Sequence, residues 1–139
     1  MALTVKRSQL PKSGKGLYTK KPIKKGEKII EYKGEIINWK QYTARVEKDE
    51  DGYLFWINNK KCIDAFPTPQ YKARYANDAR GLSRTKGLKN NSQYETFKDK
   101  CFIVSTREIK SGEEIFVNYG KEYWDVIRYN IKIGRHPKG

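Results

Sequence analysis

Histidine and cysteine, which serve many active sites as bases, nucleophiles and metal ligands, are scarce in this chain. The single histidine, His136, stands in a terminal stretch of glycine, proline and lysine. Cys62 and Cys101 each lie within an apolar run, as small core residues do. The sequence therefore argues against a His-based catalytic triad, a disulfide framework and a metal site.

Two of the ten tyrosines belong to two copies of one short phrase, at 23–34 and 109–120. In both copies Gly, Glu and Ile follow the first Ile after three, four and six residues, and the last Gly follows after eleven. Tyr32 and Tyr119 fall at nine and ten residues. Each copy predicts a turn at glycine followed by a strand. The period is too short for a solenoid, and two similar β-turns are the simplest interpretation of the spacing alone.

The elements that must position these residues are mostly short strands. Strands are expected over 3–6, 17–20 and 28–33, and hairpins over 53–64 and 93–105. Asn38 and Gln41 have the spacing of a capping box, which predicts a short helix through Val46. The stretch 81–91 is rich in Gly, Ser, Lys and Asn and predicts a loop, whereas the apolar spacing after Gly120 suits a second helix. This pattern predicts one mainly β domain without a linker.

The chain has a large surplus of positive charge. Its 30 Lys and Arg residues exceed its 16 Asp and Glu residues by 14. Such a surplus attracts polyanions such as DNA, RNA or nucleosomes, and it serves solubility equally well. No apolar run is as long as a membrane span, and the N-terminus lacks the core of a signal peptide. We therefore expect a soluble intracellular protein with no membrane partner.

Five segments together carry a more specific signal. In chain order they are Gly-Lys-Gly-Leu-Tyr at 14–18, Glu-Tyr-Lys-Gly-Glu at 31–35, Tyr-Leu-Phe at 53–55, Arg-Tyr-Ala-Asn at 74–77, and Asn91 and Tyr94 with Gly-Glu-Glu-Ile-Phe-Val-Asn-Tyr-Gly at 112–120. Each motif is weak alone, but the ordered set resembles the SET-domain protein-lysine methyltransferases. The resemblance implies a SET domain over 5–124, followed by a C-terminal helix and tail over 125–139. The implied fold is mainly β, with several small sheets, few short helices and a threaded, pseudoknot-like C-terminal segment.

The resemblance also implies an activity, the transfer of methyl from S-adenosylmethionine to a lysine amine. The reacting groups must be held in line, and a glycine loop lets backbone groups approach the cofactor closely. The implied cofactor-binding residues are Ser13, Lys15, Gly16, Tyr53, Arg74, Asn77, Asp78 and Trp124. Two of them have simpler interpretations, because Tyr53 could be a core aromatic residue of a hairpin and Trp124 a core tryptophan.

By the same resemblance Tyr119 is the central catalytic tyrosine, and Tyr32 and Tyr94 line the lysine channel. A tyrosine is apolar on its face and polar at its tip, and a dry aromatic channel favours the neutral, nucleophilic amine. Any of the three could instead be a core or surface residue. Val117, at the position that tends to set product number in the family, favours di- or trimethylation. A hydroxyl from Tyr94 would restrict that space, and we expect a mainly monomethylated product.

Two departures from the family's pattern stand side by side. Asp78 occupies the position of a histidine, and 13 residues separate Asn77 from Asn91 where the pattern has five, so 79–90 is an insertion. Asp78 could favour the sulfonium electrostatically or tie down the loop by accepting backbone hydrogen bonds, and we favour the second. The cysteine-rich zinc segment that follows the domain in many relatives is absent, so Tyr123 and Trp124 are candidates for that wall of the channel.

The function implied is therefore a lysine methyltransferase acting on a histone or histone-like chromosomal protein. Such a substrate would be delivered on nucleic acid, in the nucleus of a eukaryote or the cytoplasm or nucleoid of a prokaryote. The acidic run at 47–51 lies where relatives carry an insert beside the peptide groove, although such runs are more often solvated loops. An alternative is a catalytically inactive SET module that binds chromatin or nucleic acid, which the departures favour. A generic RNA-binding β domain ranks last, because no aromatic binding motif is present.

Overall fold

The computed structural model describes residues 2–11, 13–48, 53–58, 60–80 and 84–120. These residues form two compact units. The first comprises the described residues of Met1–Tyr32 and Lys72–Tyr119, and the second comprises those of Lys33–Tyr71 together with Gly120. The first unit is mainly β, and the second combines three short strands with one helix, so the described residues as a whole are mainly β, as the sequence predicts. No helix in the described part of the chain has the length and apolar character of a membrane span.

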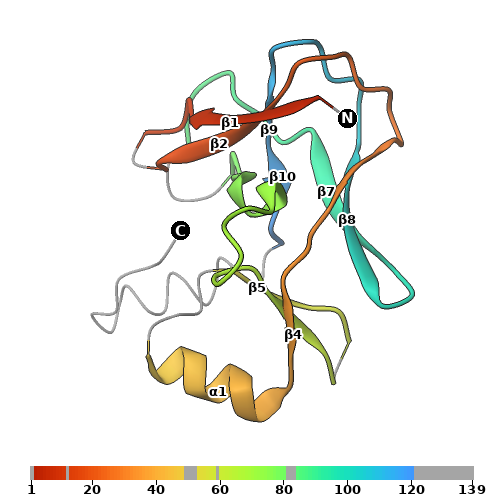
Figure 1. Ribbon diagram of the computed structural model, residues 1–139. Coiled ribbons are helices and arrows are strands. Elements are labelled where there is room, and N and C mark those ends of the chain that lie inside the picture. The colour runs from red at the N-terminus through yellow and green to blue at the C-terminus, as the bar shows by residue number, and fades with distance from the viewer. Residues whose placement is uncertain (1, 12, 49–52, 59, 81–83, 121–139) are drawn as a thin grey trace. The chain divides into compact units, whose positions relative to one another are not determined.

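The first unit contains two small sheets (Figure 1). One has the strand order β1-β2-β9, all antiparallel: β1 (Leu3–Arg7), β2 (Lys15–Thr19) and β9 (Glu114–Ile115). The other has the order β10-β7-β8-β3: β10 (Val117–Asn118), β7 (Ser92–Phe97), β8 (Lys100–Ser105) and β3 (Lys28–Glu31). The expected hairpin over 93–105 is confirmed, with Lys98 in the left-handed conformation at its turn. A short 3-10 helix, η1 (Lys72–Tyr75), has no apolar period that would have predicted it.

The two copies of the repeated phrase bind each other. Ile23 and Ile109 exchange backbone hydrogen bonds of 2.8 and 2.9 Å. Each copy then turns at a glycine in the left-handed region, with φ of +83° at Gly26 and +86° at Gly112. The Gly26 N–H donates to the carbonyl four residues before Ile109, and the Gly112 N–H donates to the carbonyl four residues before Ile23. The repeat is therefore an approximate internal two-fold arrangement as well as a pair of similar turns.

The expected threaded segment is confirmed. Val117 on β10 pairs in parallel with Ser92 on β7, and Phe116 forms a parallel bridge with Asn77 on its other side. The Val117 N–H donates to the Asn77 carbonyl at 2.8 Å. Asn91 is fully buried, donates its side-chain amide to the Glu114 carbonyl and accepts from the Phe116 N–H. The last strands thus run between two segments that precede them in the sequence.

The second unit is a three-stranded antiparallel sheet with one helix. Its strand order is β4-β6-β5: β4 (Glu35–Ile37), β6 (Cys62–Asp64) and β5 (Leu54–Trp56). Helix α1 (Trp39–Glu47) begins with the predicted capping box, since Asn38 and Gln41 each accept the other's backbone N–H. No strand was predicted at β4, because its sequence shows no clean apolar alternation, and the structure leaves Ile36 53% exposed.

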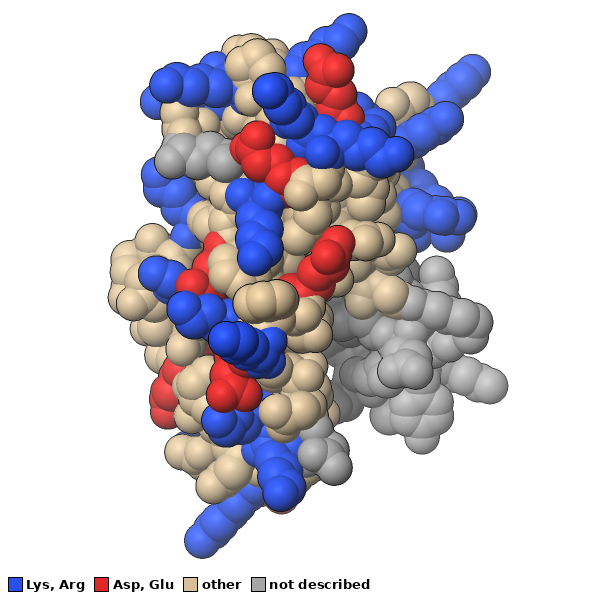
Figure 2. All heavy atoms as spheres, turned by 90° about the vertical axis from the view of Figure 1, so that its right-hand side faces the viewer, with Lys and Arg blue, Asp and Glu red and all other residues tan. Residues whose placement is uncertain are grey.

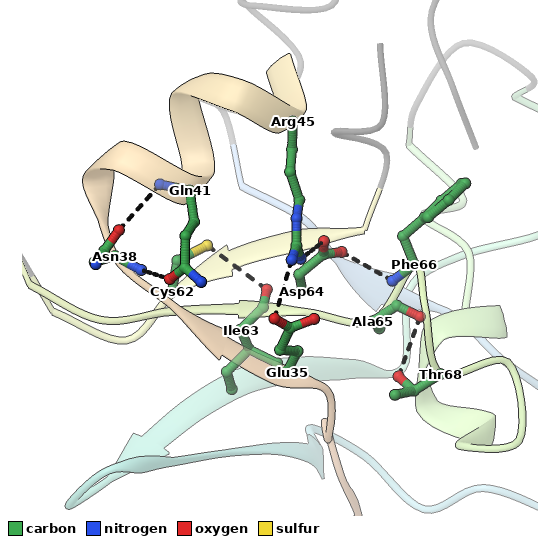
Figure 3. A network of polar contacts seen from close by, with 10 residues as sticks. All are labelled: Glu35, Asn38, Gln41, Arg45, Cys62, Ile63, Asp64, Ala65, Phe66 and Thr68. Carbon is green, nitrogen blue, oxygen red and sulfur yellow. Dashed lines mark hydrogen bonds and ion pairs between the residues drawn. The ribbon is translucent and has the colours of Figure 1, made fainter. Parts of the chain in front are cut away.

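A buried carboxylate holds this unit together. Asp64 is fully buried, and the Arg45 guanidinium on α1 pairs with both Asp64 and Glu35 (Figure 3). The other carboxylate oxygen of Asp64 accepts the Phe66 N–H at 2.8 Å, which fixes the turn after β6. A buried charge is tolerated only where it is paired and hydrogen-bonded, so these contacts join the helix, two strands and the turn.

Both cysteines are core residues, as the sequence predicts. Cys62 and Cys101 are free thiols with no measurable exposure. Burial raises the pKa of each thiol to about 12, so the nucleophilic thiolate is suppressed at neutral pH.

Two glycine substitutions should separate close packing from backbone strain. In Gly34→Ala the new Cβ would overlap the Asp64 carbonyl and come within 2.9 Å of the Ala65 nitrogen, and backbone atoms cannot rotate away. We expect a loss of about 3 kcal/mol or more in the free energy of unfolding. Gly112→Ala meets open space and only the positive φ, so its loss should be about 1–2 kcal/mol. Denaturant unfolding of the whole chain measures both, and equal losses would contradict this account.

Candidate functional site

Three tyrosines from distant parts of the sequence form one cluster in the first unit. The Tyr94 ring lies edge-on to the Tyr32 ring, with centroids 5.7 Å apart, and stacks on the Tyr119 ring at 6.2 Å. The sheet explains this grouping. Because Asn118 on β10 pairs with Gln93 on β7, the next residue of each strand brings Tyr119 beside Tyr94. Tyr32 follows β3 and donates its N–H to the Cys101 carbonyl on β8.

Tyr119 is held at both ends. Its hydroxyl donates a 2.6 Å hydrogen bond to the Ala76 carbonyl, and its backbone N–H donates to a carboxylate oxygen of Asp78 at 2.9 Å. Tyr119 remains partly accessible, whereas Tyr32 is only 5% exposed. The hydroxyl and the ring therefore have defined positions without complete burial.

Asp78 connects Tyr119 to the insertion. The carboxylate is 5% exposed, and its second oxygen accepts the Arg80 N–H and the Asn90 side-chain amide, both at 2.8 Å. Asn90 in turn accepts the Ala79 N–H at 2.8 Å. The bond from the Arg80 N–H is a backbone hydrogen bond of the kind that the loop-anchoring alternative expects, and the same carboxylate also fixes the Tyr119 backbone.

The glycine-rich loop rests on a buried acid. Gly14 has φ of +65°, and its carbonyl accepts the Ser8 N–H at 2.8 Å. Glu114 is 2% exposed, and its carboxylate accepts from the Ser8 hydroxyl at 2.6 Å and from the Gln9 N–H at 2.9 Å. A Cβ on Gly16 would collide with this carboxylate, so Gly16 allows the close approach. Burial, and secondarily the Glu114 charge, raise the pKa of Tyr18 on the same strand.

The loop is joined to the segment that follows η1. Asn77 donates its side-chain amide to the Lys15 carbonyl at 2.9 Å. The Arg74 guanidinium lies 5.0 Å and the Lys15 ammonium 6.0 Å from the centroid of the Tyr75 ring. The first unit thus contains five of the residues expected at the cofactor: Lys15, Gly16, Arg74, Asn77 and Asp78. Ser13, in the same loop as Lys15, is half-buried.

The other two residues expected at the cofactor are Tyr53 and Trp124. Tyr53 belongs to the second unit, where its carbonyl accepts the Ala65 N–H at 3.1 Å. Trp124 lies outside the described residues, as do Tyr123 and most of the acidic run at 47–51. Within the described residues, no group of three or more His, Cys, Asp or Glu side chains could hold a metal ion.

Sequence reasoning missed three supporting groups. Glu114 offered a signal, because it is the second acid of the Gly-Glu-Glu phrase and is followed directly by the apolar run Ile-Phe-Val at 115–117. Asn90 gave no signal beyond the composition of its loop. The Ala76 carbonyl had none, because a backbone acceptor is recognised only after the chain has folded.

Most of this chain is similar to known proteins of one family. The SET domain family model matches residues 14–120. Histone-lysine N-methyltransferase set-1 of Caenorhabditis elegans is 30% identical over 127 residues, which cover 84% of this chain and 50% of that protein. Human histone-lysine N-methyltransferase 2D is 34% identical over 118 residues, covering 81% of this chain and 2% of that protein.

A solved structure has the same fold. It is ctPRC2 in an autoinhibited conformation bound to S-adenosylmethionine, with a TM-score of 0.68 and 25% identity over 94% of this chain and 17% of that one. The chain spans at most half the length of the curated relatives described above. The family match covers most of the chain and contains the tyrosine cluster, the glycine loop and the threaded segment. The chain belongs to the SET-domain family.

Proposed function

We propose that this protein is an S-adenosylmethionine-dependent protein-lysine N-methyltransferase that acts on a histone or a histone-like chromosomal protein. The observation that carries the proposal is the cluster of Tyr32, Tyr94 and Tyr119 within the unit that also holds the glycine loop. The names of the relatives support the activity and the substrate class, and the S-adenosylmethionine in the related structure supports the cofactor. A histone substrate would place the protein with chromatin inside the cell.

The residues around the glycine loop fit the cofactor. S-adenosylmethionine, when bound, supplies a methyl group on a positively charged sulfonium. The left-handed Gly14, where a Cβ would meet open space, leaves room for close approach to backbone groups. Asn77 stabilises the loop through its hydrogen bond to the Lys15 carbonyl. Arg74 and Asp78 lie close to Asn77 in the sequence. Ser13, Tyr53 and Trp124 complete the proposed set.

The tyrosine cluster would prepare the lysine for transfer. A lysine amine must lose its proton before its lone pair can attack, and aromatic walls that exclude water lower the pKa of an amine. Ring faces also hold an amine or methylated ammonium through cation–π attraction. Tyr119 is the group that would orient it, because the hydrogen bonds to Ala76 and Asp78 fix both its hydroxyl and its backbone. Because the orienting group is already fixed before the lysine binds, less entropy is lost on reaching the transition state, and the barrier to an in-line displacement falls.

The second candidate is a catalytically inactive SET module that binds chromatin or nucleic acid. The observation in its favour is the replacement of the pattern's histidine by Asp78 together with the insertion at 79–90. The two candidates differ in one measurable property, which is affinity for the cofactor.

Titration calorimetry with S-adenosylmethionine should therefore give saturable binding, and EDTA should leave it unchanged. The expected pocket consists of backbone and side-chain groups and needs no metal ion. Asn77→Ala, which removes the amide that holds the Lys15 carbonyl, should weaken binding by about tenfold, the effect of about 1.4 kcal/mol. No heat from the unaltered protein would favour the inactive module, and a loss with EDTA that zinc restores would contradict the metal-free site.

Tyr119→Phe should lower methyl transfer by about ten- to a thousandfold, because the orienting hydroxyl is lost. The lost hydrogen bond to Ala76 should also reduce stability by about 1 kcal/mol. Tyr18→Phe is the matched control, since the Tyr18 hydroxyl makes a similar 2.7 Å bond to the Arg7 carbonyl. It should lose comparable stability and keep most of the turnover. Full turnover in Tyr119→Phe would show that another tyrosine is catalytic.

Tyr94→Phe should increase the di- and trimethylated fraction on a peptide substrate. Val117 is fully buried, whereas Tyr94 contacts both other tyrosines and is only half-buried, so its hydroxyl is the better candidate to restrict the space beside the amine. A hydroxyl or the water it binds occupies the volume that another methyl group requires. Mass spectrometry of the product distinguishes the cases. An unaltered enzyme that readily trimethylates, or an unchanged product spectrum in the variant, would refute this role.

A further inference from the structure

Described residues of the insertion, within 79–80 and 84–90, line a hollow of about 560 Å³ on the first unit. Four cationic residues line it: Arg80, Arg84, Lys86 and Lys89. No acidic side chain is among the described residues of its lining, and the sequence 79–90 contains neither Asp nor Glu. The hollow therefore concentrates one sign of charge within a short stretch of chain.

The described backbone of this stretch has a defined conformation. Asn90 closes the ends of the loop through its bonds to Ala79 and Asp78. Leu88 packs against a core cluster that includes Leu10 and Phe116, and Gly87 adopts φ of +87° in the turn that brings the Leu88 N–H to the Thr85 carbonyl. The cations are thus mounted on an organised loop, so a ligand would not have to order the described part of the loop on binding.

The positive charges of the hollow are not neutralised within the described residues. None of the ion pairs found there involves Arg80, Arg84, Lys86 or Lys89, and the Arg84 Nε donates to the uncharged Arg80 carbonyl at 3.0 Å. The face in Figure 2 differs, because acidic side chains lie among its lysines and arginines. Like charges in proximity repel one another, and a bound polyanion would relieve that repulsion.

We propose that this hollow binds the phosphodiester backbone of a nucleic acid. Phosphate oxygens accept hydrogen bonds from arginine and lysine, and several cations along one loop suit a polymer of phosphates better than a single anion. A membrane surface is the less favoured ligand, because peripheral membrane sites add exposed apolar anchors. The one large apolar residue in the described lining, Leu88, is partly buried and packs against the core. The base of the loop shares the Asp78 carboxylate with Tyr119, so the nucleic acid would be held by the unit that contains the tyrosine cluster.

Fluorescence anisotropy with a short labelled DNA duplex and a single-stranded RNA tests the proposal without any cofactor or substrate. The test variant is Lys86→Gln/Lys89→Gln, and the matched control is Lys24→Gln/Lys25→Gln, which removes the same charge from exposed positions elsewhere on the first unit. The test variant should bind at least one of the two nucleic acids about tenfold or more weakly at ~0.15 M salt. The slope of log K against log salt concentration should fall by about two, whereas the control should lose less than about threefold. Thermal unfolding followed by circular dichroism should be unchanged in both variants.

Three results would overturn the site. Equal losses in the two double variants would show that only net charge matters. Failure of the unaltered protein to bind either nucleic acid at ~0.15 M salt would rule out nucleic acid as the ligand. Binding to phosphatidylserine vesicles that the test variant loses, while it keeps its affinity for nucleic acid, would make the hollow a membrane site. Because no methyl transfer is measured, these results do not depend on the proposed enzymatic activity.

Discussion

Burial of the segment from Glu114 to Val117 is the constraint on which the rest of the first unit depends. These residues are at most 3% exposed, so their backbone N–H and C=O groups must find partners within the protein. The partners come from both sides: Asn77 accepts from Val117, and Asn91 and Ser92 bond to the Glu114 and Phe116 backbone. Because the segments at Asn77 and at 91–92 hold residues 114–117 on both sides, Tyr119 has a fixed position beside Tyr94. For the same reason Glu114 has a fixed position beneath the glycine loop.

Much of the fold was predictable because it depends on local patterns. The capping box at Asn38, the hairpin turning at Lys98 and the glycine turns of the repeat are short-range features, and each forms where it was expected. The contact between the two copies was not predictable from spacing. The bridge between Ile23 and Ile109 joins residues far apart in the sequence, and only the burial of both side chains at 1% exposure or less makes it necessary.

The candidate site also contains residues that could be predicted from the sequence and groups that could not. The tyrosines and glycines of the motifs could be identified from the sequence, because their types and order carry the resemblance. The groups that hold them could not, because they are backbone acceptors or polar residues without a pattern, such as the Ala76 carbonyl and Asn90. Glu114 lies between these cases. Its place in Gly-Glu-Glu was visible, but its role beneath Gly16 required the position of β9 beside β2.

Asp78, where the family resemblance implies a histidine, and the long loop that follows it can be understood as one feature. A carboxylate accepts hydrogen bonds at several lone pairs, whereas a neutral imidazole accepts at one nitrogen. Asp78 uses this capacity for three donors: the Arg80 N–H and the Asn90 amide, which close the insertion, and the Tyr119 N–H. A single imidazole acceptor could not serve all three, so the longer loop requires the carboxylate. Since the same carboxylate also fixes the Tyr119 backbone, the insertion and the tyrosine cluster depend on one buried side chain.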